Sequence, residues 1–167
     1  PHANIVKLSH KIEPIFNKIF PPENFKKFQE VALDKDNVWT QFALGILNDI
    51  DRSVVKQMLL SFGIDAGYYG TKAVRENREK YKCNIPFNIL FDPTSACNLN
   101  CKGCWSAEYG HSFQLSLDEM RSIVTQGKEM GTHFYMLTGG EPIIRKNDIV
   151  TLASENKECT FLIYTNA

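Results

Sequence analysis

Three cysteines, Cys97, Cys101 and Cys104, stand so close in the sequence that a single loop can present all three thiols to one metal centre. Thiolates are soft ligands that suit iron–sulfur clusters or zinc, and a shared metal offsets the charge of thiolates crowded in this way. A four-iron cluster held by three cysteines keeps one iron open to a small molecule, whereas a structural zinc site needs four closed ligands. The spacing therefore indicates a metal centre.

A second group of chemically suggestive residues, Gly139-Gly140-Glu141-Pro142, follows an apolar run. Glycines lack a β-carbon, so the backbone can approach a ligand closely and adopt dihedrals barred to other residues. Their carbonyl groups can then accept hydrogen bonds from an ammonium group, and Glu141 adds a carboxylate, which makes the stronger, charge-assisted kind of bond. The same four residues could also be a tight strand-to-helix turn, with Glu141 at a helix start where its charge favours the helix dipole.

Composition excludes several functional classes. Lys plus Arg and Asp plus Glu number 19 each, so there is no basic field that would signal nucleic acid or an anionic membrane. Apolar runs such as 42–47 and 161–164 are far shorter than the roughly 20 residues of a membrane span. The 5 cysteines do not suggest a disulfide framework, and Cys83 and Cys159 fit small buried apolar residues. We expect a soluble, cytoplasmic protein.

The residues that must position these motifs fall into two segments. Residues 1–84 show the three-four apolar spacing of helices and are predicted to form a helical N-terminal subdomain packed on the remainder of the chain. Pro21-Pro22 stops the first helix, and Gly63 is predicted to close a later one. The stretch 67–70 is predicted to be a loop, after which Thr71 caps a short charged helix.

From residue 85 the pattern changes to strands alternating with helices. Apolar runs at 87–91, 133–137 and 160–164 predict strands, and the first delivers the chain directly into the cysteine loop. Between them, Ser116 and Glu119 form a capping box that begins a helix, and a second helix lies around 149–153. Strand, helix, strand, helix, strand implies an α/β fold with parallel pairing, in which ligands gather at the carboxyl ends of the strands.

The two motifs, in this order and each after a predicted strand, resemble those of the radical S-adenosylmethionine (SAM) enzymes. The resemblance implies that 85–167 is the first half of a partial (βα) barrel, an incomplete TIM-barrel-like sheet of parallel strands, preceded by the helical subdomain of residues 1–84. A start at Pro1 instead of methionine fits a fragment. We expect the rest of the barrel or another subunit to cover the open apolar edge at 161–164.

The resemblance also implies the chemistry. Cys97, Cys101 and Cys104 would each ligate an iron of a 4Fe–4S cluster, and the fourth iron would be chelated by the amino and carboxylate groups of SAM. Reductive cleavage of SAM would give a 5'-deoxyadenosyl radical that acts on an unidentified substrate. An electron donor of the flavodoxin or ferredoxin type would be the partner, and no catalytic side chain is assigned.

Further cofactor-binding residues follow from the same resemblance. The turn of Gly139, Gly140, Glu141 and Pro142 is assigned to the methionyl amine. In many members an aromatic residue precedes the third cysteine, whereas here that position is Gly103 and the aromatic Trp105 follows. Trp105 is therefore a candidate for shielding the cluster, with core packing as the alternative. Asn166, at the end of the third predicted strand, is a further candidate contact.

A function of a different class remains open from the residues themselves. The three-cysteine loop could be a structural metal site in a non-catalytic zinc-binding or scaffold protein. In that case Cys83 or His111 would complete the fourth ligand position.

Overall fold

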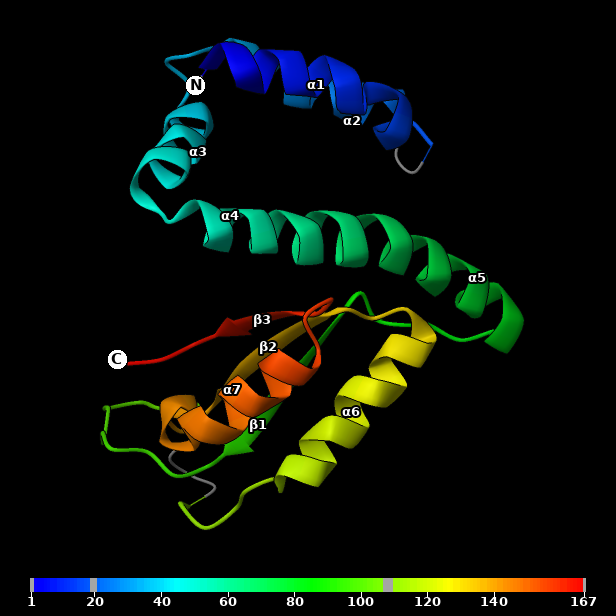
Figure 1. Cartoon of the computed structure of the whole chain (residues 1–167). Helices are drawn as coiled ribbons and strands as arrows, with labels where there is room; N and C mark the ends of the chain where they lie inside the picture. The colour runs from blue at the N-terminus through cyan, green and yellow to red at the C-terminus, as the bar shows by residue number, and fades with distance from the viewer. Residues whose placement is uncertain (1, 19–20, 107–109, 167) are drawn as a thin grey trace. The chain divides into compact units, whose positions relative to one another are not determined.

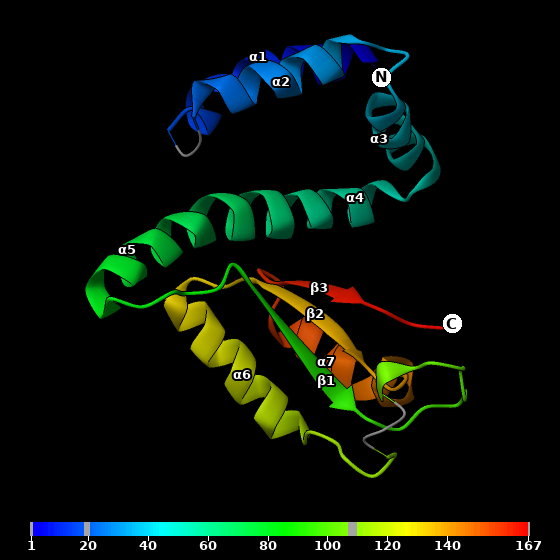
Figure 2. The same cartoon turned by 180° about the vertical axis from the view of Figure 1, so that it is seen from behind.

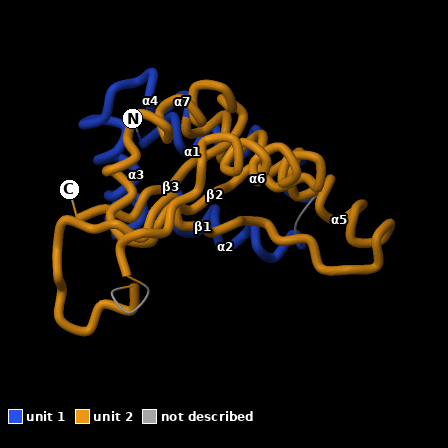
Figure 3. Tube along the Cα trace, turned by 90° about the horizontal axis from the view of Figure 1, so that it is seen from below, with its two compact units in different colours: residues 1–57 blue, residues 58–167 orange. Residues whose placement is uncertain are grey.

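The structure, a computed structural model, describes residues 2–18, 21–106 and 110–166 (Figure 1). It divides into two compact units, Pro1–Gln57 and Met58–Ala167 (Figure 3). The predicted boundary at residue 84 lies inside the second unit. The reason is that the segment after Met58 packs on the strands: the Phe62 ring lies 5.2 Å from that of Phe134, and the hydroxyl of Thr160 donates to Ser61 Oγ at 2.9 Å.

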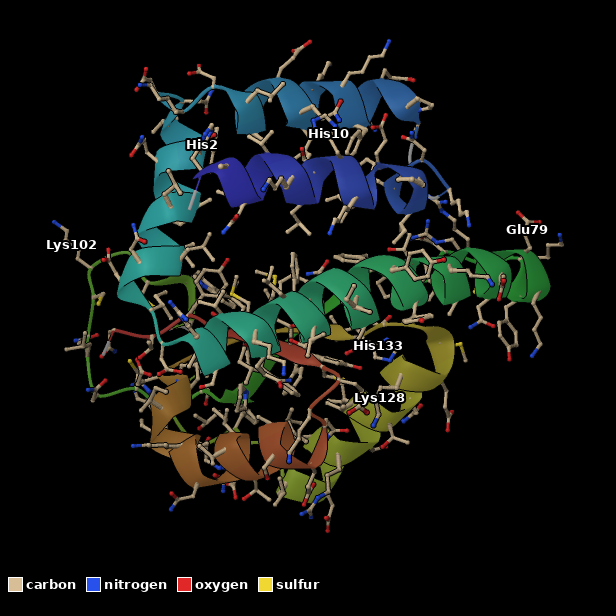
Figure 4. The ribbon with its side chains drawn as sticks, turned by 45° about the horizontal axis from the view of Figure 1, so that its top comes forward. His2, His10, Glu79, Lys102, Lys128 and His133 are labelled. Atoms are coloured by element: carbon tan, nitrogen blue, oxygen red, sulfur yellow. The ribbon has the colours of Figure 1, made fainter. Side chains whose placement is uncertain are left out.

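The first unit is helical, as expected. It contains α1 (His2–Phe16), α2 (Pro22–Leu33) and α3 (Val38–Asp49). Helices α1 and α2 run antiparallel, since His2 Nε2 at the start of α1 lies 3.0 Å from the carbonyl oxygen of Ala32, and Phe16 at its end contacts Phe25. Figure 4 shows the two helices side by side, with His2 and His10 both on α1. The Asn37 side chain caps α3 by accepting from the Trp39 amide.

A continuous helical stretch comes next, made of α4 (Arg52–Met58), the π-helix η1 (Leu59–Gly70) and α5 (Thr71–Tyr81). The predicted helix end at Gly63, the loop at 67–70 and the cap at Thr71 are wrong. The glycine signal has a different cause at Gly70, where a β-carbon would come within 2.7 Å of the Gly131 carbonyl oxygen. Glycine there permits close packing of the helix instead of ending it.

The sheet consists of β1 (Asn88–Thr94), β2 (Phe134–Gly139) and β3 (Thr160–Ile163), parallel and in the order β1-β2-β3. Helices α6 (Leu117–Met130) and α7 (Lys146–Glu155) connect the strands, and Figures 1 and 2 show both on the same face of the sheet. Neighbouring parallel strands with their helices on one face are the arrangement found in a (βα) barrel. The α/β fold class and the strand–helix alternation are confirmed.

The core lies between this sheet face and the two helices. Tyr135 and Leu137 of β2 pack against Met120 and Val124 of α6 and Leu152 of α7, and all five side chains are fully buried. On the opposite face the strands present a row in register, Leu90, Met136 and Leu162, of which the two leucines are substantially exposed.

The boundaries of α6 come from its own sequence. Ser116 accepts from the Glu119 amide and Glu119 bonds back to Ser116, as the capping box predicts. Gly131 ends the helix with a φ of 95°, a left-handed conformation that favours glycine. These two signals fix the helix that returns the chain from the cysteine loop to β2. None of the helices in the described ranges is long and apolar enough to cross a membrane.

Candidate cluster and cofactor site

The carboxyl ends of the strands bring the two sequence motifs into direct contact. The cysteine loop follows β1, and the Gly-Gly-Glu-Pro turn follows β2. The amide of Gly140 donates to the carbonyl of Thr94 at 3.0 Å, and the amide of Glu141 donates to the carbonyl of Ala96 at 2.8 Å. The turn is therefore hydrogen-bonded to the residues that lead into Cys97.

Both glycines of the turn are required by this geometry. Gly139 has a φ of 107°, which is unfavourable for any residue with a side chain. A β-carbon on Gly140 would collide with the carbonyl of Ala96. The backbone of the turn thus lies against the backbone of the cysteine loop with no room for a side chain between them.

The three thiols of Cys97, Cys101 and Cys104 line one small hollow, together with His111. Cys101 is exposed and the other two are half-buried, and all three are free. Between Cys101 and Cys104 the chain makes a turn, with Lys102 pointing outward (Figure 4). Within the part of the chain that the structure describes, no three His, Cys, Asp or Glu side chains are close enough to share a metal ion. The thiols face a common space but are not assembled as ligands.

The donor set nevertheless suits an iron–sulfur cluster. Three soft thiol donors lie on one accessible loop, and the Leu99 amide donates to Cys97 Sγ at 3.4 Å. Cys83 precedes β1 while the loop follows it, so the 7 residues of the strand hold that thiol roughly 20 Å away. Cys83 cannot complete the site. His111 can, because it lines the same hollow.

Glu141 is held by the chain itself. Its Oε1 accepts from the Ile143 amide at 2.9 Å and from the Thr165 hydroxyl at 2.7 Å, and its Oε2 accepts from the Asn166 amide at 2.8 Å. Burial alone would raise the pKa of Glu141, but the three hydrogen bonds bring that pKa below its usual range. The carboxylate thereby ties the turn after β2 to the end of β3.

The remaining predicted site residues surround this junction. The Asn166 side-chain amide donates to Asn98 Oδ1 at 3.0 Å and lies 3.9 Å from Cys97 Sγ, so the end of β3 contacts the cysteine loop. Pro142 is buried at the start of η3 (Pro142–Arg145). Trp105 is exposed and lines a cavity of about 470 Å³ beside the thiol hollow.

Arg145 is a structural residue of the site that sequence patterns did not reveal. Its guanidinium donates to the carbonyls of Pro93 and Leu115 at 3.2 and 2.7 Å, and it forms an ion pair with Asp148. Pro93 and Leu115 flank the cysteine loop, so this side chain bonds to both ends of the loop, which the Leu115 amide also joins by donating to the Pro93 carbonyl at 3.1 Å. The sequence did contain one indication of this role. Arg145 stands at the start of a helix, where the helix dipole disfavours a cation, so a specific hydrogen-bond acceptor is needed to hold it there.

Comparison with known proteins agrees with this geometry. Residues 91–167 match the sequence model of the Radical SAM superfamily. The chain is also similar to proteins named GTP 3',8-cyclase. The one from Desulforamulus reducens is 36% identical over 73 residues, which are 41% of this chain and 22% of that protein. The one from Mannheimia succiniciproducens is 45% identical over 65 residues, 36% of this chain and 19% of that protein.

Residues 91–167, a little less than half of the chain, are thus similar to the radical SAM superfamily. Enzymes of this superfamily use a 4Fe–4S cluster and SAM. The matched segment spans only about a fifth of the length of these relatives.

Proposed function

We propose that this chain carries the cluster-binding portion of a radical SAM enzyme. The observation that supports this most directly is the contact between the motifs: the cysteine loop after β1 is hydrogen-bonded to the Gly-Gly turn after β2, at the carboxyl ends of parallel strands. In folds of this class such ends are where ligands bind. A zinc knuckle would need no such turn beside it.

Each residue would have a defined role. Cys97, Cys101 and Cys104 would hold the cluster, which when bound supplies the electron that cleaves the sulfonium bond of SAM. The carbonyls of Gly139 and Gly140 would accept hydrogen bonds from the methionyl amine. Glu141 and Pro142 would fix the turn, and Asn166 and Trp105 would lie beside the ligand, with Asn166 contacting Cys97.

The substrate is the less constrained aspect of the proposal. The relatives are named for action on GTP, but the similarity covers only about a fifth of the length of those proteins. GTP is therefore the first substrate to test. A reductant of the flavodoxin or ferredoxin type would supply electrons. A reducing cytoplasmic compartment would suit the 5 free cysteines.

Electron paramagnetic resonance tests the central proposal. The protein is reconstituted anaerobically with iron and sulfide, reduced with dithionite and measured with and without SAM. We expect a 4Fe–4S signal that changes when SAM is added and is absent from the Cys97→Ala, Cys101→Ala, Cys104→Ala triple variant. A signal that persists in the triple variant, or no cluster in the wild type, would contradict the proposal.

One observation favours a second candidate, a structural zinc site, because His111 lines the thiol hollow and could supply a fourth ligand. Metal analysis after anaerobic purification separates the two. Stoichiometric zinc that is lost in His111→Ala, with no iron bound on reconstitution, would support the zinc site. Iron and sulfide retained in His111→Ala would exclude it.

A further inference from the structure

Asp92, in β1, has an unsatisfied carboxylate oxygen. Among the residues that the structure describes, Asp92 Oδ1 is the buried side-chain nitrogen or oxygen atom with no hydrogen-bond partner. Burial raises the pKa of Asp92, as expected where no donor compensates for the loss of water. An unpaired buried polar atom is costly, and such atoms in folded proteins call for a specific explanation.

The position of Asp92 suggests that explanation. A β-carbon placed on Gly139 would come within 2.8 Å of Asp92 Cβ and 3.0 Å of its carboxyl carbon, so the carboxylate lies directly against the glycine turn. Asp92 also lines the cavity of about 470 Å³ beside Trp105. Ser95 and Ser106 line both this cavity and the thiol hollow, which makes the two spaces adjacent.

The cavity is suited to a positively charged group. Asp92 is the single charged residue among its described lining residues, and two aromatic side chains, Trp105 and Phe113, stand on its wall. A carboxylate and aromatic rings together favour a cation. No Lys, Arg or His among those residues would compete for the carboxylate.

Glu141, the acidic residue of the turn itself, has little free capacity. It is 4% exposed, and three donors of the chain occupy its two oxygens. Asp92, in contrast, has a carboxylate oxygen for which the described residues supply no donor. The carboxylate of Glu141 is thus occupied by donors of the chain, whereas that of Asp92, a residue that lines the cavity, has an oxygen with no donor.

We infer that Asp92 is the carboxylate that binds the charged amino group of SAM, together with the backbone of the glycine turn. The inference rests on the proposed function and adds to it a binding residue outside both sequence motifs. The carboxylate that pairs with the ammonium group of SAM would thus come from β1, while Glu141 would hold the conformation of the turn through its hydrogen bonds.

Isothermal titration calorimetry of the anaerobically reconstituted protein tests this inference with two probes. SAM carries the charged amino group, and 5'-methylthioadenosine shares the adenosine moiety but lacks that group. In Asp92→Asn we expect SAM to bind about tenfold to a hundredfold more weakly, the effect of one lost charge-assisted hydrogen bond, and methylthioadenosine to bind as in the wild type. Asp92→Ser should repeat the loss, and Asp118→Asn, an exposed carboxylate on α6, should leave both affinities unchanged.

Three results would overturn the inference: unchanged SAM affinity in Asp92→Asn, an equal loss for both probes, or a loss of SAM affinity in Glu141→Gln but not in Asp92→Asn. The 4Fe–4S signal of each variant is recorded in parallel. A wild-type protein without a cluster would refute the proposed function itself, whereas an intact cluster with unchanged SAM affinity in Asp92→Asn would refute only the assignment of Asp92.

Discussion

The two units of the molecule carry similar amphipathic helices but bury them differently. In residues 58–167 the apolar faces of α6 and α7 meet the sheet, and Met120, Val124 and Leu152 are completely buried. In residues 1–57 few apolar side chains are buried, Phe25 and Ala32 among them, while Trp39 of α3 is 68% exposed. A helical stripe becomes a core only where a second layer covers it. The site is built on the unit that has that layer.

The difference in burial predicts that a Leu→Ala substitution will lower the free energy of unfolding much more in the second unit than in the first. Leu137→Ala removes a fully buried side chain from the sheet core and should lower the free energy of unfolding by about 2–5 kcal/mol. Leu8→Ala in α1, where the side chain is 54% exposed, should cost no more than about 0.5 kcal/mol. Urea denaturation followed by circular dichroism measures both, and equal losses would show that the first unit has a core of its own.

Removing a basic side chain should also affect the two units differently, both in stability and in the signal of the reconstituted cluster. Arg145→Met would leave the carbonyl of Leu115 without its guanidinium donor and the carbonyl of Pro93 with only the amide of Leu115, and should cost about 2 kcal/mol. It should also broaden the spectroscopic signal of the reconstituted cluster, because the loop would lose the side-chain bonds that supplement the backbone bonds between its two ends. Arg145→Lys should recover some of both effects. The exposed Lys11 of α1 is the control, and Lys11→Met should change neither property. A cluster signal unaltered in Arg145→Met would show that the loop does not depend on this residue.

Helix caps should give a smaller effect. Ser116→Ala removes the capping box of α6 and should lower the free energy of unfolding by about 1 kcal/mol. Asn37→Ala removes the comparable cap of α3, whose helix has little packing to hold it, so the loss should appear mainly as reduced helicity of the native protein. Circular dichroism before and during denaturation distinguishes these outcomes, and an identical response of the two variants would weaken the contrast.

The smallest effect concerns acid stability of the second unit. The hydrogen bond from Lys128 is the largest influence on Glu158 and holds its pKa below the usual range. A lowered pKa in the folded state stabilises the protein above the unfolded value of about 4.3, and this contribution is lost as the pH falls through the folded pKa. Glu158→Gln should therefore be slightly less stable than the wild type at pH 6 and equal to it near pH 2. A stability difference that stays constant with pH would contradict this.

Sequence patterns sufficed where the determining interactions are local. The cap at Ser116, the helix end at Gly131 and the strand before the cysteine loop were predictable because neighbouring residues set them. Gly70 was misread because a glycine that permits close packing looks the same in sequence as one that makes a turn. The roles of Arg145 and Asp92 were not predictable because they depend on groups distant in sequence. Arg145 bonds to backbone carbonyls at the two ends of the cysteine loop, and Asp92 lies beside a cavity and the glycine turn. The roles of the three cysteines remain predictions.

The contact between Gly140 and the Ala96 carbonyl has a consequence for protein design. A peptide containing only the cysteine loop would lack the glycine turn that packs against the residues leading into Cys97. Its thiols would then be free to form disulfides or to bind other metals. Grafting the loop onto another scaffold would succeed only if the glycine turn of the adjacent strand were transplanted with it. The smallest portable unit of the proposed metal site is therefore a pair of neighbouring strand ends, and not a linear motif.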